Sequence, residues 1–201
     1  AVLTLELWTY FKTLLGKEDL WPIANLELEL LPCLIDMTWT GVRVDMDAVE
    51  KTRVALIKEE KDVLSEIKRM TNMDVEIWAA QSLSKAFDKM SIAYPKTEKG
   101  QPSFTKGFLS EHEDKLPRLI VKARNLNKTH GTFINTIMRH TGRDGRIHSH
   151  INQIRSDDGG TVSGRISMSN PNLQQIPARD PVLGPMIRSL FLPEEGDKWA
   201  A

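Results

Sequence analysis

The chain has 201 residues, with 27 Lys and Arg against 27 Asp and Glu, and therefore no net charge. This length can bury one hydrophobic core or two. The sequence predicts neither a membrane span nor a signal peptide, because it has no run of about 20 apolar residues and no basic segment leading into an apolar one. The single cysteine, Cys33, excludes an internal disulfide, and no cluster of Cys and His has the spacing of a zinc site.

The zero net charge conceals an uneven distribution along the chain. Residues 1–114 carry 14 basic and 20 acidic side chains, and residues 156–201 carry 4 and 6. Residues 115–155, between them, carry 9 basic side chains and 1 acidic side chain. Such a basic segment in a neutral chain indicates a face that binds a polyanion, with a solvated helix face as the alternative.

Two helices are predicted at the start of the chain, over residues 1–15 and 23–38, because apolar residues recur there at helical spacing. Residues 40–45 then form a turn and a short extended piece. Asp45 or Asp47 is expected to cap the helix that follows, because aspartate favours that position.

A long helix over residues 46–70 is predicted from a seven-residue apolar repeat. The repeating positions are Val49, Leu56, Val63 and Met70. Residues 58–62 alternate in sign and are expected on the exposed side, which is the pattern of a coiled-coil-like arm that needs a partner. The partner helix is predicted over residues 116–138. Between the two arms, a short helix over residues 78–90, an exposed loop over residues 94–105 and a second short helix are expected.

Two strands are predicted after the second arm. Residues 147–155 alternate between apolar and polar side chains, and residues 161–167 follow a Gly-rich turn. His148 and His150 fall on one face of the first strand, but they lack a third ligand at suitable spacing and so do not predict a metal site. Residues 182–192 are expected to form a helix or an extended piece.

The segment from Thr161 to Arg179 concentrates side-chain amides in a short span. Each amide can both donate and accept hydrogen bonds, and the four are Asn170, Asn172, Gln174 and Gln175. Ile166, Leu173 and Ile176 are spaced between them as apolar anchors. This mixture suits a surface that fixes donors against a ligand with many acceptors, such as a groove of a nucleic acid.

Part of this segment resembles a known signature. Residues Gly164–Ser167, Asn170–Pro177 and Arg179 are similar to the pattern G-R-L-S-S-x-(D/N)-P-N-L-Q-N-I-P-x-R. That pattern precedes the first catalytic motif of the DNA polymerase I-like (family A) DNA polymerases. The departures are Met168, at the second serine, and Gln175, where asparagine is common.

Two shorter stretches support the resemblance. Residues 40–45 are similar to the family's n-G-v-x-(I/V)-D element, and residues 124–133 to its R-x-L-x-K-…-(S/T)-T-Y element in the thumb domain. The resemblance implies an α+β fold that is mostly helical, with long antiparallel helical thumb arms, a small helical tip, and then short antiparallel strands of the palm. It implies the last helix of a 3′–5′ exonuclease-like domain at 1–20, the thumb at 21–140, and the N-terminal part of the palm at 141–201, truncated before the first catalytic aspartate.

The resemblance also assigns DNA-binding roles. Arg165 is placed in the minor groove at the primer terminus, where it bonds acceptors common to all correct base pairs. The thumb residues are placed along the product duplex, which they position without reading its sequence. The residues expected to contact DNA are Arg124, Lys128, Thr132, His148, Arg165, Asn172, Gln174 and Gln175. Those expected near the phosphates of the incoming nucleotide or the template strand are Arg179 and Arg188.

The implied function is that of a template-directed DNA polymerase, which extends a primer with dNTPs in replication or repair. It uses two Mg²⁺ ions whose carboxylate ligands are expected outside this chain. This chain is then expected to grip the primer–template duplex, to hold no catalytic or metal-binding residue and to be inactive alone. A monomer in the cytoplasm of a bacterium or a phage-infected host is expected, with an organelle as the other location. The long loop near Asp157 favours a phage-type lineage.

Two other functions fit parts of the sequence. A stand-alone, non-catalytic module that binds duplex DNA would keep the fold without the chemistry. A helical arm protein that binds another protein through residues 46–70 would account for neither the basic segment nor the amides. Duplex binding that weakens steeply with salt separates the DNA-binding interpretations from this last one.

Overall fold

The computed structural model describes residues 2–155, 159–177 and 180–198. These residues form two compact units. The first draws its described residues from Ala1–Arg43, His140–Ile176 and Pro193–Ala201. The second draws them from Val44–Arg139 and Pro177–Leu192. Residues 21–43 group with the strands here, and the division into an exonuclease-like helix, a thumb and a palm stays a prediction.

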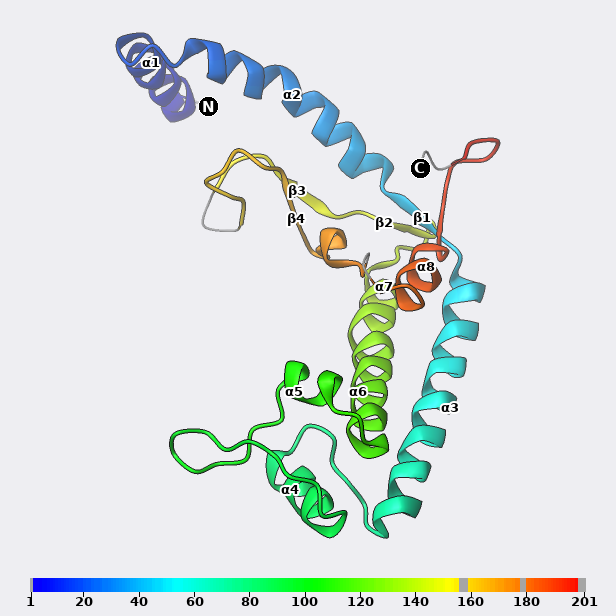
Figure 1. Ribbon diagram of the computed structural model, residues 1–201. Helices are drawn as coiled ribbons and strands as arrows, with labels where there is room; N and C mark the ends of the chain where they lie inside the picture. The colour runs from blue at the N-terminus through cyan, green and yellow to red at the C-terminus, as the bar shows by residue number, and fades with distance from the viewer. Residues whose placement is uncertain (1, 156–158, 178–179, 199–201) are drawn as a thin grey trace. The chain divides into compact units, whose positions relative to one another are not determined.

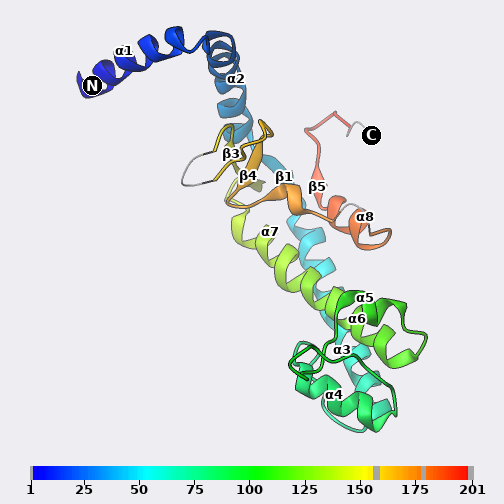
Figure 2. The same cartoon turned by 60° about the vertical axis from the view of Figure 1, so that its left-hand side comes forward.

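Two long helices form the arms of the second unit, α3 (Met46–Thr71) and α6 (Lys115–Lys128). Figures 1 and 2 show them side by side and antiparallel. α3 begins after Asp45, whose Oδ1 accepts a hydrogen bond from the backbone N–H of Ala48 at 2.9 Å. The predicted aspartate cap is therefore confirmed, at the first of the two candidate positions.

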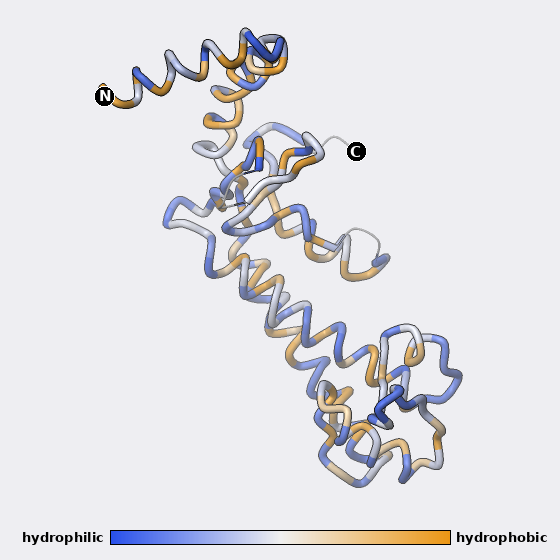
Figure 3. Tube along the Cα trace, turned by 90° about the vertical axis from the view of Figure 1, so that its left-hand side faces the viewer, coloured by the Kyte–Doolittle hydropathy of each residue, from blue (hydrophilic) through white to orange (hydrophobic). Residues whose placement is uncertain are grey.

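Each arm buries one apolar stripe. From α3 the buried apolar residues are Val49, Leu56, Val63 and Ile67. From α6 they are Leu116, Pro117, Ile120, Ala123 and Leu126. Figure 3 shows apolar positions recurring along both helices. Full burial of one such leucine or isoleucine contributes about 1.5–3 kcal/mol to stability, so the stripes are the main reason that the arms pair.

The second arm changes its helical geometry part of the way along. Residues Thr129–Ile134 form a π-helix, after which α7 (Asn135–His140) continues. The sequence predicts one regular helix over 116–138, and this is wrong over the π-helical residues. Thr129 is buried there, and its Oγ1 donates to the carbonyl oxygen of Asn125 at 2.6 Å.

The tip between the arms holds α4 (Ala80–Lys89) and α5 (Lys106–Glu111). They surround a cluster of aromatic rings. Phe87 is fully buried, with its ring centroid 4.8 Å from that of Phe104 and 6.0 Å from that of Tyr94. This cluster gives the tip an apolar core of its own, and the small helical tip that the sequence predicts is confirmed.

The second unit also contains α8 (Leu183–Arg188) and β5 (Phe191–Leu192). The carboxylate of Asp180 accepts two backbone N–H bonds, at 3.0 and 2.8 Å, where α8 begins. Leu190 is buried, and its carbonyl oxygen accepts the backbone N–H of Asp45 at 2.9 Å. This bond ties the segment to the start of α3.

The first unit begins with α1 (Val2–Lys17) and α2 (Trp21–Thr40). All 16 residues of α1 are described, and none of them is buried. Its contact with α2 includes an edge-to-face pair of Trp8 and Trp21, with ring centroids 6.3 Å apart. Among the described residues, no helix combines the length and the apolar character needed to cross a bilayer.

The strands of the first unit are short and antiparallel. β1 (Val42–Val44) pairs with β2 (Arg146–Ile147), and Val42 lies opposite Ile147. β3 (His150–Asn152) pairs with β4 (Ser167–Ser169), and the register places Ile151 opposite Met168. Together with the dominant helices, these strands confirm the predicted α+β class.

The strand predicted over residues 161–167 is wrong for most of its length, because pairing starts only at Ser167. The chain bends before that point. Gly164 has a φ of +72°, a conformation that favours glycine. The Oγ1 of Thr161 donates to the carbonyl oxygen of Arg165 at 2.7 Å. This bond closes the bend and prevents an extended strand.

Candidate nucleic-acid interface

The exposed face of the second arm ends in a lysine. Lys128 is the last residue of α6, and its side chain is exposed. It makes no ion pair with any residue that the structure describes. Thr132, in the π-helical segment, is exposed as well. A free ammonium and a hydroxyl can both bond phosphate oxygens, so both predicted DNA contacts remain available.

Arg124 lies differently from Lys128. Its Nε donates to the carbonyl oxygen of Ile77 at 2.7 Å, and its Nη1 donates to that of Phe104 at 3.0 Å. Its guanidinium also lies over the ring of Trp78, 5.0 Å from the centroid. Burial lowers the pKa of Arg124, because desolvation disfavours the charged form. Arg124 therefore anchors the tip to the arm, and its expected contact with DNA stays a prediction.

Two lysines of the basic segment form ion pairs with glutamates of the first arm, α3. Lys115 pairs with Glu66 at 2.5 Å, and Lys122 pairs with Glu59 at 2.6 Å. The hydrogen bond from Lys115 lowers the pKa of Glu66. These pairs are exposed and add little stability. Some of the basic side chains of residues 115–155 therefore bond the first arm, and only the others are available to a polyanion.

Arg165 lies in the bend before β4 and is exposed. Its guanidinium makes no hydrogen bond or ion pair with the described residues. Its backbone, in contrast, is held by the bond from Thr161 and by the turn at Gly164. A fixed backbone with a free guanidinium suits a residue that bonds acceptors on a ligand.

The amide side chains next to Arg165 hold the segment in shape. Nε2 of Gln174 donates to the carbonyl oxygen of Ile166 at 3.0 Å, and its Oε1 accepts the backbone N–H of Met168 at 3.2 Å. Oδ1 of Asn172 accepts the backbone N–H of Gln174 at 3.0 Å. The side chain of Gln174 thus holds the backbone on both sides of Ser167.

The other two amides, Asn170 and Gln175, are exposed, and neither makes a side-chain hydrogen bond to the described residues. Gln175 stands in the short 3₁₀ turn η2 (Leu173–Gln175). The structure therefore divides the predicted amide cluster into two residues that shape the loop and two whose side chains are free of bonds to the described residues. The DNA-binding role of each stays a prediction.

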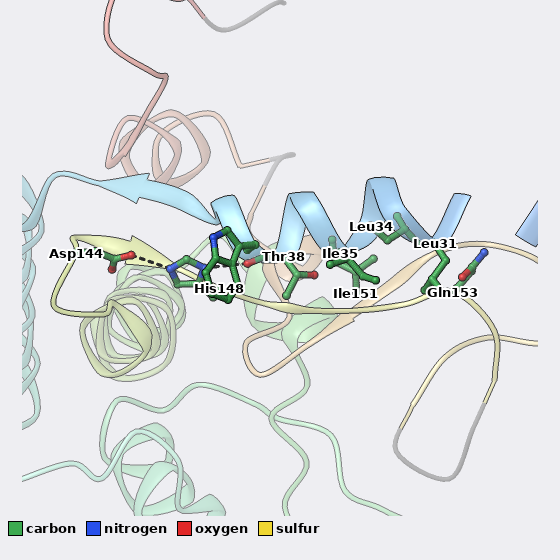
Figure 4. A pocket seen from close by; sticks show the side chains of 9 residues that line it. Leu31, Leu34, Ile35, Thr38, Asp144, His148, Ile151 and Gln153 are labelled. Atoms are coloured by element: carbon green, nitrogen blue, oxygen red, sulfur yellow. Dashed lines mark hydrogen bonds and ion pairs between the residues drawn. The ribbon is translucent and has the colours of Figure 1, made fainter. Parts of the chain in front are cut away.

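His148 lies between two acceptors. Its Nδ1 is 2.8 Å from the carbonyl oxygen of Thr38, and its Nε2 is 2.9 Å from Oδ2 of Asp144 (Figure 4). Neither partner can donate a proton, so both bonds form fully only when the imidazole carries two N–H groups. In agreement, the pKa of His148 is raised, first by the hydrogen bond to Asp144 and next by that to Thr38. The ring of His148 is engaged within the first unit, and its expected contact with the duplex stays a prediction.

A pocket of about 700 Å³ adjoins this histidine. Figure 4 shows its wall, which comes from α2 on one side and from the residues around β3 on the other. The lining residues are Leu31, Leu34, Ile35, Thr38, Trp39, Asp144, His148, Ile151 and Gln153. Nε2 of Gln153 donates to the carbonyl oxygen of Glu27 at 2.7 Å, which fixes this lining residue to α2. The wall is mostly apolar, with its charged pair at one end.

The two remaining predicted residues are Arg188 and Arg179, and the structure describes only the first. Arg188, the last residue of α8, is exposed and has no ion pair among the described residues. Arg179 lies outside the described residues. Across the part of the chain that the structure describes, no three side chains of His, Cys, Asp or Glu come together in a way that could hold a metal ion.

Sequence reasoning missed Glu60. It was assigned to the exposed side of α3, yet only 9% of its surface is exposed. The signal was present in the spacing: Glu60 follows Leu56 by four residues and precedes Ile67 by seven, which places it on the buried stripe. The alternating charges of residues 58–62 hid this.

Comparisons with known proteins agree on one family. The family model for DNA polymerase family A matches residues 46–201. A DNA-directed DNA polymerase of Pseudomonas phage M6 is 33% identical, over 93% of this chain and 29% of its own length. DNA polymerase DpoZ of Acinetobacter phage SH-Ab 15497 is 32% identical, over 97% of this chain and 34% of its own length. The thermostable DNA polymerase I of Thermus aquaticus is 33% identical, over 90% of this chain and 22% of its own length.

A solved structure has a similar fold. It is the POL domain of Pol1 from M. smegmatis, in a complex with DNA primer-template and dNTP. It matches 85% of this chain and 30% of its own chain, with a TM-score of 0.68 and 23% identity. The chain spans only about a third, or less, of the length of the curated relatives that it matches.

Proposed function

This chain belongs to DNA polymerase family A, and on that basis we propose that it is the part of a template-directed DNA polymerase that grips the primer–template duplex. The intact enzyme would extend a primer with dNTPs. The observation that carries the proposal is the segment from Thr161 to Gln175. Its own side chains hold its backbone, while the guanidinium of Arg165 is left exposed.

Arg165 has the chemistry that a minor-groove contact needs. Every correct base pair presents acceptors there, at N3 of purines and O2 of pyrimidines, so a guanidinium can bond any of them. A mispair displaces these acceptors. An arginine on a fixed backbone then loses its bond, and extension slows. Arg165 would thus check the geometry of the primer terminus without reading its sequence.

The second arm would hold the duplex by its backbone. Lys128 and Thr132 are exposed on it, and contacts of their type to phosphates position a duplex in any sequence. Arg188 would reach the template strand or the phosphates of the incoming nucleotide. The proposal keeps the three parts predicted from the resemblance, with the thumb at residues 21–140.

Family A DNA polymerases generally use Mg²⁺. The described residues of this chain do not fit such an ion, because no three candidate ligands lie together among them. No catalytic step is therefore assigned to them, and we propose that the metal ligands belong to other parts of the enzyme and that this chain is inactive alone. The relatives are phage and bacterial proteins, which supports an enzyme working in the cytoplasm of a bacterium or a phage-infected host. We also propose that the enzyme is a monomer.

The test separates binding from extension. In the full-length polymerase that contains this chain, Arg165→Ala should lower primer extension far more than affinity for the primer–template. Arg155→Ala, which removes another exposed arginine of the same unit, is the matched control. Equal losses of extension and affinity would contradict the role of Arg165. If the wild-type chain shows no salt-dependent binding of duplex DNA, the proposed function itself fails.

A further inference from the structure

Glu60 is a buried carboxylate between the two arms. Its side chain is 11% exposed, and that of His130, which faces it, is 16% exposed. Oε2 of Glu60 lies 2.5 Å from Nε2 of His130, and Oε1 accepts a hydrogen bond from Nδ2 of Asn127 at 2.9 Å. Both carboxylate oxygens are thus bonded by the second arm, as a buried charge requires.

These two contacts bracket Lys128. Asn127 precedes it in α6, and His130 follows it in the π-helical segment Thr129–Ile134. A single π-helical turn within an α-helix is rare and frequently marks a functional site. One carboxylate therefore holds the helix on both sides of an exposed lysine, at the point where the helical geometry changes.

Asn127 extends the contact to the tip. Its Oδ1 accepts a hydrogen bond from Nε1 of Trp78 at 3.0 Å. The same Trp78 ring lies under the guanidinium of Arg124, which bonds the carbonyl oxygen of Ile77. A continuous series of polar contacts thus runs from Glu60 on α3, through the second arm, to the tip.

We propose that Glu60 is a positioning residue for duplex binding. By bonding Asn127 and His130, it fixes the π-helical segment, and so sets the direction in which Lys128 and Thr132 leave the second arm. The inference rests on the proposed function, because these two residues are its expected contacts with DNA. Glu60 itself touches no DNA in this account and acts only through its partners.

Packing alone does not account for a carboxylate at this position. A leucine at position 60 would continue the buried stripe between Leu56 and Val63. Replacing both partners of a buried polar contact with apolar groups of the same shape can be nearly neutral or even stabilising. Two acceptor oxygens, in contrast, bond a residue at the end of α6 and a residue of the π-helical segment at the same time, and so hold this part of the arm in place.

The test compares three substitutions of this chain with a neighbouring control. Glu60→Leu removes both acceptors, and it should weaken binding of a fluorescent primer–template duplex about tenfold and reduce the slope of log affinity against log salt by about one contact. Glu60→Gln keeps an acceptor for Asn127 and a donor for His130, so it should bind within about twofold of the wild type. Asn127→Ala, which leaves the Glu60–His130 pair in place, should give an intermediate loss. Glu59→Leu removes the adjacent carboxylate and its pair with Lys122, and it should leave the affinity within about twofold.

Two further measurements distinguish positioning from general loss of structure. In a double-mutant cycle, Glu60→Leu should add much less to the effect of Lys128→Ala than it costs alone, because the Lys128 contact is already lost and only that of Thr132 remains. The double variant Glu60→Leu/His130→Phe should keep the melting temperature of the wild type while its affinity stays low. Hydrogen exchange should become faster at residues 129–134 in Glu60→Leu and remain unchanged in α4.

Several outcomes would overturn the inference. It fails if folded Glu60→Leu binds duplex DNA like the wild type, if its effect adds fully to that of Lys128→Ala, or if the double variant regains affinity together with stability. If Glu60→Leu does not fold, Asn127→Ala and the double variant decide the question. A wild-type chain that does not bind DNA refutes the proposed function instead, and the exchange at residues 129–134 then still shows whether Glu60 fixes that segment.

Discussion

Asp144 and His148 form a paired carboxylate and imidazole, with Oδ2 of Asp144 at 2.9 Å from Nε2 of the ring. The pair has opposite effects on the two groups. The pKa of His148 rises above its ordinary 6.5, chiefly through the hydrogen bond to Asp144. The pKa of Asp144 falls below its ordinary 3.8, chiefly through the bond to His148 and then through the backbone N–H of Arg146.

These shifts predict how the stability of the first unit depends on pH. The contribution of charged His148 is complete below its ordinary pKa and is lost as the pH rises through the raised value. The contribution of charged Asp144 is complete above its ordinary pKa and is lost as the pH falls through the lowered value. The pair should therefore stabilise most between about pH 4 and 6.5.

Replacing Asp144 with asparagine should bring the NMR titration midpoint of His148 back toward about 6.5 and flatten the pH dependence of the melting temperature. Both groups are partly exposed, so added salt should also reduce the effect in the wild type. Asp47→Asn, on α3, is the matched control and should leave the midpoint unchanged. A His148 midpoint that is the same in Asp144→Asn and the wild type would refute the pairing.

Gly41 occupies a backbone conformation that only glycine readily adopts, with φ of 66° and ψ of −171°. A Cβ there would lie 2.8 Å from the ring of His148 and 2.9 Å from the carbonyl oxygen of Ile147. Gly41→Ala should therefore lower the free energy of unfolding by about 1–3 kcal/mol for backbone strain, with a further loss from the clash. Urea denaturation measures it.

Gly100→Ala is the control for that substitution. Gly100 also has a positive φ, of 75°, but a Cβ there would meet nothing within 4 Å. The difference between the two variants isolates the close approach to His148. Equal losses would mean that strain alone explains the glycine at position 41.

Lys128→Ala should weaken duplex binding without changing stability, because the side chain is exposed. If it makes one phosphate contact, the magnitude of the slope of log affinity against log salt should fall by about one. Fluorescence anisotropy over a salt series measures this. Lys58→Ala removes an exposed lysine from α3 and should leave the slope unchanged, whereas equal changes in both variants would indicate only non-specific attraction.

Gln174→Ala should loosen the bend that carries Arg165. It removes the acceptor for the backbone N–H of Met168 and the donor to the carbonyl oxygen of Ile166. A hydrogen bond of this kind contributes about 1 kcal/mol, so exchange of the Met168 amide should become roughly fivefold faster. Gln175→Ala, one residue away, removes no side-chain bond to a described residue and should have no effect. Unchanged exchange in Gln174→Ala would show that the bend is held by other contacts.

The long helices and the cap at Asp45 could be predicted because they depend on local chemistry: apolar spacing and a short acceptor side chain. The π-helical turn could not. Leu126, His130 and Ile137 recur at spacings that a regular helix also satisfies, so the pattern carries no sign of the extra residue. His130, inside that turn, contacts Glu60, which is 70 residues away in the sequence.

The sequence predicts which residues belong to the candidate interface. It does not predict which of their side chains bond the rest of the chain and which are exposed. Arg124 and Lys128 look equivalent in the sequence, since both are basic and stand four residues apart. Only the fold shows that Arg124 bonds carbonyl oxygens of the tip while Lys128 is exposed. The same holds for Gln174 and Gln175, since only the fold brings the backbone of Ile166 and Met168 next to the side chain of Gln174.

The absence of any buried residue in the fully described helix α1 has a practical consequence for handling the protein. Leu3 and Leu5 are 69% and 66% exposed, and Tyr10 and Phe11 are 60% and 51% exposed. Large exposed apolar side chains on one helix favour self-association. In dilute solution the isolated chain should scatter more light as its concentration rises, and removing residues through Lys17 should lower that scattering. Colloidal behaviour, and not only affinity, will therefore decide the concentrations at which its binding can be measured.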